Sequence, residues 1–169
     1  DGIPAASIYA MCHGLEQVGV DQQTFGIFET LMDARSLYLT PNSSTVYVTH
    51  CFDLEDGPIV LEASPGLLGP LDDAYFRHIV DVGVTGPDKG KGGKYLFVHT
   101  SYKGELPPGY FVVKVPTYRN PAFFRAFVND GDIAGASPAA NEHTALVRVA
   151  SCITDEVLQY APQQRRVAF

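Results

Sequence analysis

Short runs in which side chains alternate between two faces limit most strongly how this chain can fold. The clearest run is Thr45–Phe52, which is rich in β-branched and aromatic residues. Successive side chains on a strand point to opposite faces, so this run presents two distinct sides. One side carries Val46, Val48, His50 and Phe52, and the other carries Thr45, Tyr47, Thr49 and Cys51. Further strands are predicted at Pro58–Ala63, Ala74–Val82, Tyr95–Thr100 and Tyr110–Val115.

The spacing of these strands indicates the fold class. They follow one another at hairpin-like intervals and do not alternate with full helices, which argues against a doubly wound parallel sheet. The sequence therefore predicts a mainly β fold with flanking helices, arranged as an antiparallel β-sandwich or a jelly-roll-like module. The length of 169 residues suits one domain or part of a larger protein.

Helices are predicted mainly near the two ends of the chain. Ile3–Val18 has Pro4 in its first turn and is followed by the stop residue Gly19. Its predicted apolar stripe consists of Ile8, Met11, Leu15 and Val18. Asn120–Pro121 has the pattern of a helix start, because Asn caps helices and Pro favours the first helical position. The predicted apolar face of this second helix is Phe123, Phe124, Phe127 and Val128. A short helix is predicted at Thr154–Tyr160, and a short helix or turn at Asp21–Glu29.

Segments rich in Gly, Pro and small polar residues predict the connections between these elements. They are Pro41–Ser44, Asp53–Gly57, Ser64–Pro70, Lys103–Gly109 and Asn129–Asn141.

Net charge argues against nucleic-acid binding, and hydropathy argues against a membrane-spanning segment. The formal net charge is −7, and a broadly acidic surface repels phosphate backbones, so nucleic-acid binding is not expected. The sequence contains no run of about 18 apolar residues, so no membrane-spanning segment is predicted.

The three cysteines, Cys12, Cys51 and Cys152, share no short spacing, so no CxxC metal or redox site is predicted. One disulfide plus one free thiol and three buried thiols are both compatible with the sequence. The chain begins at Asp1 without Met and runs at once into a helical pattern, which favours a processed or truncated N-terminus.

The segment Gly83–Phe97 combines glycines and lysines between two predicted strands. A phosphate-binding loop needs the pattern GxxxxGK[ST] followed by a helix. Here Gly86 and Gly90 are three residues apart, Lys91 is followed by Gly92, and a strand follows. We therefore expect a flexible connection between strands with solvated lysines, with a looser anion-contacting loop as the alternative.

Aspartates and histidines supply the candidates for catalysis or metal binding. Asp72 shares a strand face with His78, and with His50 from another strand the three could orient a general base or hold a divalent metal. His99 on a third strand is a further candidate. The competing interpretation is that each histidine is an ordinary core residue, and that Asp73 pairs with Arg77 or caps a turn.

Evidence for nucleophilic catalysis is weak in this sequence. No GxSxG elbow is present, and neither Ser64 nor Ser101 supplies one. Cys51 follows His50 directly, but neighbours on a strand face apart, so a base would have to come from another element. Tyrosines recur along the strands, and their polar-tipped rings could line a binding pocket or simply cover a sheet surface. The candidate binding residues are Tyr47, Tyr75, Arg77 and Asp73.

Several segments occur in an order that resembles a known bacterial family. They read GIPAASIYAM, LMDARSLYLTPNSSTVY, DLEDGPIVLE, LDDAYFRHIVDVGVTGPDKGKGGKYLFV, YKGELPPGYFVVKVPT and FFRAFVNDGD. From Gly2 to Asp132 this succession resembles the family called domain of unknown function 1254. The resemblance implies a β-rich, jelly-roll-like module, an export signal, and a following domain of unknown function 1214. It implies no agreed catalytic residues; the matching positions of interest are Asn42, Tyr47, Asp53, Asp72, Asp73 and Arg77.

These observations predict a family-like β-rich domain with an N-terminal helix at 1–137 and a divergent or truncated tail at 138–169. The preferred hypothesis is an uncharacterised module that binds a small or carbohydrate-like ligand, or a partner domain. One alternative is an exported hydrolase or metal-assisted enzyme that uses Asp72, His78 and His50. Another is a structural subunit of an assembly, either a homo-oligomer or a complex with a second β-domain. The family resemblance favours a periplasmic or secreted location, and no cofactor is identified.

Overall fold

The computed structural model describes residues 2–22, 24–28, 30–32, 42, 44–136, 145–148 and 165–168. Within these residues the chain forms two helices and ten strands. In chain order they are α1 (Ile3–Gln17), β1 (Thr24–Ile27), β2 (Thr45–Asp53), β3 (Ile59–Ala63), β4 (Leu68–Asp72), β5 (His78–Gly83), β6 (Gly93–His99), β7 (Phe111–Val115), β8 (Arg119–Phe127), α2 (Ile133–Ala136), β9 (Ala145–Arg148) and β10 (Arg165–Ala168).

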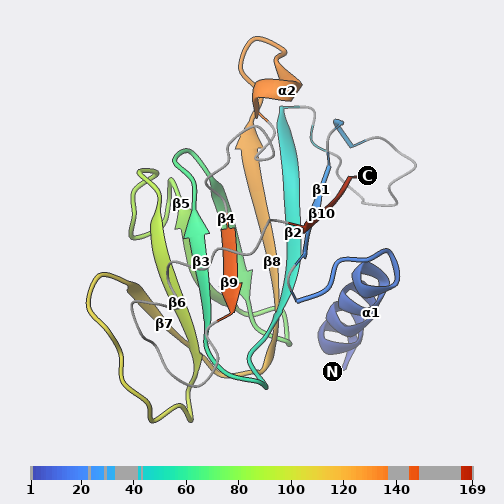
Figure 1. Ribbon diagram of the computed structural model, residues 1–169. Coiled ribbons are helices and arrows are strands. Elements are labelled where there is room, and N and C mark those ends of the chain that lie inside the picture. The colour runs from blue at the N-terminus through green and yellow to red at the C-terminus, as the bar shows by residue number, and fades with distance from the viewer. Residues whose placement is uncertain are drawn as a thin grey trace.

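The strands form two sheets that pack as a sandwich (Figure 1). One sheet has the order β10-β1-β2-β8-β4-β5, and the other has the order β7-β6-β3-β9. The pairs β1–β10 and β6–β7 are parallel, whereas β2–β8, β4–β5 and β3–β6 are antiparallel. The prediction of a mainly β, sandwich-like fold is therefore confirmed, and the narrower jelly-roll topology stays a prediction.

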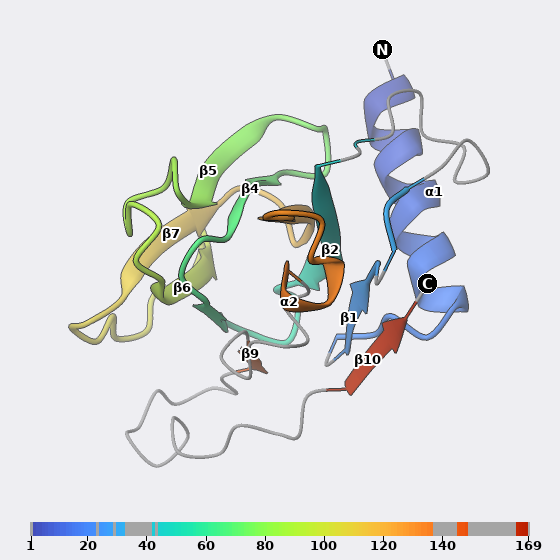
Figure 2. The same ribbon diagram turned by 90° about the horizontal axis from the view of Figure 1, so that it is seen from above.

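The two sheets face each other (Figure 2). The main hydrophobic core lies between them, formed by alternate side chains of the facing strands. The ring of Phe52 on β2 stacks on that of Phe97 on β6, with centroids 5.2 Å apart. Tyr95 and Phe124 are also fully buried in this cluster. Two of the predicted strands, Thr45–Phe52 and Tyr95–Thr100, thus supply central core residues.

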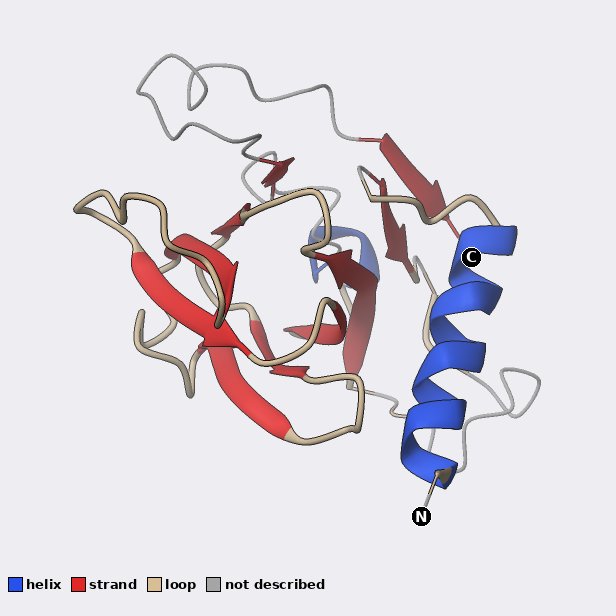
Figure 3. Ribbon diagram, turned by 90° about the horizontal axis from the view of Figure 1, so that it is seen from below, coloured by secondary structure: helices blue, strands red, loops and turns tan. Residues whose placement is uncertain are grey.

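Helix α1 lies along the outside of the six-stranded sheet (Figure 3). Ile8 and Cys12 pack against Cys51 on the outer face of β2, so both faces of this strand are buried. The predicted helix Ile3–Val18 is confirmed with an end one residue earlier, and Gly19 follows with a φ of +94°, which glycine adopts readily. Among the described residues, no helix combines the length and the apolar character needed to cross a membrane.

The predicted helix after Asn120 is wrong, because this segment is the strand β8. Its backbone pairs along its whole length with β2, from Arg119 opposite Asp53 to Phe127 opposite Thr45. Asn120, Ala122 and Phe124 are buried, whereas the later residues become exposed in alternation. Pairing within the sheet thus overrides a local Asn-Pro pattern that favours a helix start.

The predicted loop Ser64–Pro70 is partly wrong, since β4 already begins at Leu68. Proline has no N–H group to donate to a neighbouring strand. On the side of β4 that faces β8, Leu68 and Leu71 are paired, whereas Gly69 and Pro70 are not. A Cβ at Gly69 would lie 1.9 Å from the carbonyl oxygen of Phe123. Glycine therefore lets the two backbones approach closely where the ladder is interrupted.

Two further boundaries differ from the sequence prediction. The strand predicted from Ala74 begins only at His78, because Asp73–Arg77 forms the turn of the β4–β5 hairpin. The segment Asp21–Glu29, predicted as a short helix or turn, contains the strand β1 instead. The predicted loop Asn129–Asn141 contains α2 and continues beyond residue 136, where it lies outside the described residues. The predicted helix Thr154–Tyr160 also lies outside them.

The glycine-rich segment connects the two sheets, since β5 belongs to one and β6 to the other. Asp88 anchors it: the buried carboxylate accepts hydrogen bonds from the N–H groups of Gly83 and Gly92 and from the Tyr95 hydroxyl. Burial and this carboxylate raise the pKa of Tyr95. The lysines Lys89, Lys91 and Lys94 are exposed as expected, but the connection is held in place by Asp88.

Candidate functional site at the polar end of the sandwich

Several strand ends and turns meet at one end of the sandwich, which we call the polar end. β2 ends at Asp53 beside Arg119, where antiparallel β8 begins. The parallel strands β6 and β7 finish together, with His99 paired to Val115. The N–H of Ala74 donates to Thr117 Oγ1 at 3.0 Å, which joins the β4–β5 hairpin to the same end. The polar end comprises residues 53, 72–78, 99–101 and 116–120, with Glu16 and Gln22.

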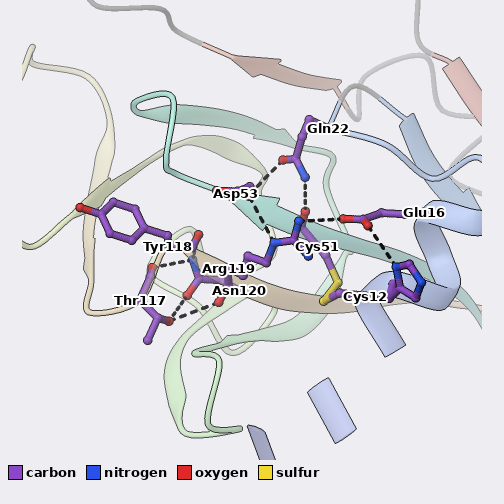
Figure 4. The surroundings of a disulfide bond; sticks show 10 residues. Cys12, Glu16, Gln22, Cys51, Asp53, Thr117, Tyr118, Arg119 and Asn120 are labelled. Atoms are coloured by element: carbon purple, nitrogen blue, oxygen red, sulfur yellow. Dashed lines mark hydrogen bonds and ion pairs between the residues drawn. A yellow bond between two sulfur atoms is a disulfide. The ribbon is translucent and has the colours of Figure 1, made fainter. Parts of the chain in front are cut away.

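Arg119 links three elements at this end (Figure 4). Its Nη2 lies 3.2 Å from Glu16 Oε1 on α1, and its Nε lies 3.3 Å from Asp53 Oδ2 on β2. Gln22 adds two hydrogen bonds to β2, donating to the Cys51 carbonyl and accepting from the Asp53 N–H. These contacts surround the disulfide that joins Cys12 to Cys51. The polar end is therefore tied to α1 by both covalent and charged contacts.

A second network fixes the turn before β8. The side-chain amide of Asn120 donates to the carbonyls of Thr117 and Tyr118, at 2.9 and 2.8 Å. Thr117 Oγ1 donates in turn to Asn120 Oδ1 at 2.7 Å. Asn120 is fully buried, so these bonds satisfy polar groups that water does not reach. Asn120 therefore orders a turn rather than capping a helix, and it sets the position of Tyr118.

Tyr118 and His99 form a flat pair of rings on the surface of the polar end. Their centroids are 4.1 Å apart and their planes differ by 14°. Tyr118 remains 45% exposed. In the plane of the imidazole, both ring nitrogens have polar neighbours: Ser101 Oγ lies 2.6 Å from His99 Nδ1, and the Pro116 carbonyl oxygen lies 3.3 Å from His99 Nε2. The pair combines an exposed aromatic surface with hydrogen-bonding groups beside it.

The hairpin turn Asp73–Arg77 is built around one buried carboxylate. Asp73 Oδ1 accepts from the N–H groups of Tyr75 and Arg77, and Oδ2 accepts from the Arg77 guanidinium. The sequence predicted that Asp73 either pairs with Arg77 or caps a turn, and the structure shows both. The turn presents Tyr75 and Phe76 to solvent, at 56% and 60% exposure. Phe76 has a φ of +61°, a conformation that non-glycine residues adopt uncommonly.

The two neighbouring aspartates of this hairpin have pKa values shifted in opposite directions. Burial acts to raise the pKa of Asp73, but the Arg77 side chain and the backbone N–H groups outweigh it and lower the pKa below 3.8. Burial raises the pKa of Asp72 above 3.8; the charge of His78 opposes this, and Asp73 and Asp81 add to it. The ionised form of Asp73 therefore favours the folded state, whereas that of Asp72 opposes it.

We expect Asp73→Asn and Asp72→Asn to change stability with opposite signs and opposite pH dependence. The contribution of Asp73 is present above its unfolded pKa and is lost as the pH falls through its lower folded pKa. Asp73→Asn should therefore destabilise the protein at pH 7, with a difference that shrinks below about pH 4. The contribution of Asp72 is present below its unfolded pKa and is lost as the pH rises through its folded pKa. Asp72→Asn should therefore raise the free energy of unfolding above that of the wild-type protein at pH 7, and this gain should be smaller at pH 3.

Urea denaturation of both variants between pH 3 and 7 measures these differences. The wild-type protein at each pH is the reference, and the slope of the unfolding curve checks that each variant still unfolds in one step. Equal and pH-independent changes for the two variants would contradict the assigned pKa directions.

The predicted trio of Asp72, His78 and His50 does not come together. Asp72 and His78 are paired across the β4–β5 hairpin. His50 lies on β2, and β8 stands between β2 and β4, which places these strands roughly 10 Å apart. The His50 ring is fully buried between Phe25 and Phe52, at centroid distances of 5.1 and 5.0 Å. In the part of the chain that the structure describes, no group of three His, Cys, Asp or Glu side chains could hold a metal ion.

The remaining sequence candidates occupy different places. Tyr75, Arg77 and Asp73 lie together on the hairpin, and Arg77 stands over the Tyr75 ring at 5.3 Å. Tyr47 lies six residues before the end of β2, under Arg125 at 5.7 Å, and is not part of the polar end. The sulfur of Cys51 is bonded to Cys12, so it is not a thiol nucleophile in this structure.

Sequence reasoning did not identify Arg119 or the pairing of Ser101 with His99, and it considered Tyr118 only as one of several tyrosines that could line a pocket. His99 and Ser101 are two residues apart at the end of a predicted strand, and this spacing was the available signal. Arg119 and Tyr118 precede a segment predicted as a helix, so their place beside β2 and β6 could not be anticipated.

A hollow of about 300 Å³ lies at the opposite end of the sandwich, near α2. Its lining residues include Leu67, Phe127 and Asn129. Small residues such as Gly66 and Ala136 shape the rest of it. No charged side chain of the described residues lines this hollow, whereas the polar end combines carboxylates, guanidinium groups, an imidazole and aromatic rings.

Comparison with known proteins adds a family and a fold. The sequence model of the family described as "Protein of unknown function (DUF1254)" matches residues 22–148. The crystal structure of the VPA0106 protein from Vibrio parahaemolyticus superposes with a TM-score of 0.65 at 13% sequence identity. The superposition covers 99% of this chain and 40% of that one, and this likeness concerns the fold alone. No curated protein sequence matches the chain.

Proposed function

Since the chain belongs to the DUF1254 family, whose description names no activity, we propose from the site that its polar end binds a small carbohydrate-like ligand. The main support for this proposal is the stacked pair of His99 and Tyr118 rings, in which Tyr118 is 45% exposed. The apolar faces of sugar rings pack well against exposed aromatic rings, while their hydroxyl groups need polar partners nearby. Ser101, Thr117 and the Arg119–Asp53 pair supply such partners at this end.

The neighbouring hairpin adds to the same surface. Ala74 is bonded to Thr117, so Tyr75 and Phe76 belong to the end of the sandwich that carries Tyr118. Asp73 fixes the turn from within, which reduces the conformational entropy that a ligand would have to freeze. A rigid aromatic surface with a few polar groups is suited to a neutral ligand, since Arg77 and Arg119 are already paired with carboxylates.

Screening neutral mono- and disaccharides by thermal denaturation tests this proposal. A ligand at 100 times its dissociation constant stabilises the folded state by roughly 2.7 kcal/mol. For a chain of this length that corresponds to an increase in Tm of roughly 5–10 °C. Tyr118→Ala should weaken binding of an identified sugar at least tenfold by calorimetric titration, because it removes the exposed ring.

Tyr9→Ala is a matched control, because Tyr9 is also an exposed tyrosine stacked on a histidine, His13. It lies on α1, a different element from those that carry His99, Ser101 and Tyr118, and its loss should leave sugar affinity unchanged. The proposal fails if no sugar stabilises the protein, or if Tyr118→Ala and Tyr9→Ala affect binding equally.

We also propose that the protein functions in an oxidising compartment, either the periplasm or the cell exterior. The Cys12–Cys51 disulfide supports this, since such bonds persist mainly in proteins of oxidising environments. The chain spans 40% of the VPA0106 protein. A second β-domain or a homo-oligomer as a partner is a further expectation, which comes from the family resemblance.

A further inference from the structure

The hydrogen bonds around His99 determine which of its two ring nitrogens carries the proton. The N–H of Ser101 lies 3.2 Å from His99 Nδ1 and can only donate, so Nδ1 must present its lone pair. Because Nδ1 then carries no proton, the Ser101 hydroxyl, 2.6 Å away, must donate its own proton to Nδ1. The remaining ring nitrogen, Nε2, therefore carries the hydrogen and donates to the Pro116 carbonyl at 3.3 Å.

This arrangement has the parts of an activated serine. A base in contact with a hydroxyl can remove its proton as the oxygen attacks, and a third group orients that base. Here the Pro116 carbonyl holds the imidazole and would stabilise the positive charge that forms on it. The face of Tyr118, 4.1 Å from the imidazole centroid, adds an attraction between a cation and an aromatic ring.

We propose that Ser101 is a nucleophile, with His99 as its general base, and that this pair transfers acyl groups from small carboxylic esters. Ser101 is exposed at the polar end, so a small ester can reach its Oγ without rearrangement of the sandwich. Ser44 differs from Ser101, because its hydroxyl bonds Asn42 Oδ1, and an amide oxygen is a poor base.

The proposed reaction proceeds in two balanced steps. Ser101 Oγ forms a bond to the carbonyl carbon while its proton moves to His99 Nδ1. The bond from that carbon to the alkoxy oxygen then breaks, and the alcohol leaves with the proton from Nδ1. In the second step water attacks the acyl carbon and gives a proton to Nδ1. The bond to Oγ breaks, Oγ takes the proton back, and the carboxylic acid is released.

A fluorophosphonate probe tests this pair directly, because Ser101 Oγ would bond to phosphorus as fluoride leaves. Intact mass spectrometry of the full chain should show one adduct, and peptide mapping should place it on Ser101. Ser101→Ala should remove the adduct. His99→Phe should slow labelling at least 100-fold, because it removes the base while keeping a ring against Tyr118. The rate of p-nitrophenyl acetate hydrolysis should be highest for the wild-type protein, lower for His99→Phe and lowest for Ser101→Ala.

Ser44→Ala is the matched control, and it should label like the wild-type protein. Circular dichroism and Tm establish that each variant is folded. The proposal is overturned if the wild-type protein gains no adduct, if Ser101→Ala keeps it, or if His99→Phe labels at the wild-type rate. This readout uses no sugar, so a failure here leaves the carbohydrate proposal standing, and absence of sugar binding leaves the labelling result unchanged.

Discussion

Reduction of the Cys12–Cys51 disulfide is expected to lower the free energy of unfolding by about 4 kcal/mol. The bond joins residues 39 positions apart, and closing a loop of that length removes considerable conformational entropy from the unfolded chain. Both cysteines are buried together with Ile8, so reduction also leaves two thiols in an apolar cluster. Guanidinium denaturation with and without a reductant measures the difference, and Tm should fall by roughly 8–16 °C.

The double variant Cys12→Ala/Cys51→Ala separates the cross-link from other effects of the reductant. Its stability should match that of the reduced wild-type protein and should not respond to reductant. The contacts of Glu16 and Gln22 with Arg119 and β2 hold the helix in the folded state only, so they do not replace the cross-link. Equal stability of the oxidised and reduced wild-type protein would contradict the expectation.

Gly83→Ala is expected to destabilise the protein by about 4 kcal/mol or more. Gly83 ends β5 with a φ of +90°, where any other residue is strained by roughly 1–2 kcal/mol. An added Cβ would also lie 1.6 Å from the Leu67 carbonyl oxygen, which is backbone and cannot move aside cheaply. The Gly83 N–H donates to Asp88, so the displacement would also disturb the connection between the two sheets. Urea denaturation gives the change in free energy.

Gly109→Ala is a closely matched control. Gly109 has a φ of +89°, but a Cβ there would meet no atom within 4 Å. Its substitution should cost only the conformational part, about 1–2 kcal/mol. A similar loss of stability in both variants would show that backbone conformation, and not contact with Leu67, sets the cost at Gly83.

The elements predicted correctly are those whose pattern depends on nearby residues. β2 was recognised from the alternation of Thr45–Phe52, and α1 from Pro4, its apolar stripe and Gly19. The Asp73–Arg77 pair was also within reach, because both residues belong to one short turn. In each case the interacting groups are at most a few positions apart, so a local pattern contains the information.

The errors at Asn120–Pro121 and at Pro70 involve residues whose partners are distant in the chain. Asn120 and Pro121 have a helix-start pattern, and only pairing with β2 makes them part of β8. Pro70 lies in a strand because close approach of β4 to β8 at Gly69 leaves its missing N–H without consequence for that ladder. Local preferences of about 1 kcal/mol per residue are small beside the burial of a central strand.

The candidate site divides in the same way. Sequence reasoning named Asp72, Asp73, Tyr75 and Arg77 within the hairpin. It also associated His50 with Asp72 and His78, although β8 separates their strands.

The amino-acid sequence by itself determined a mainly β module with an N-terminal helix, a central alternating strand and the local pairing of Asp73 with Arg77. The tertiary structure alone decided that Cys12 bonds to Cys51, that Arg119 joins α1 to β2, and that Tyr118 stacks on His99. The first group follows from steric and hydrogen-bonding preferences of adjacent residues. The second depends on which strands become neighbours, and that choice is made by burial of the whole core, which no single segment encodes.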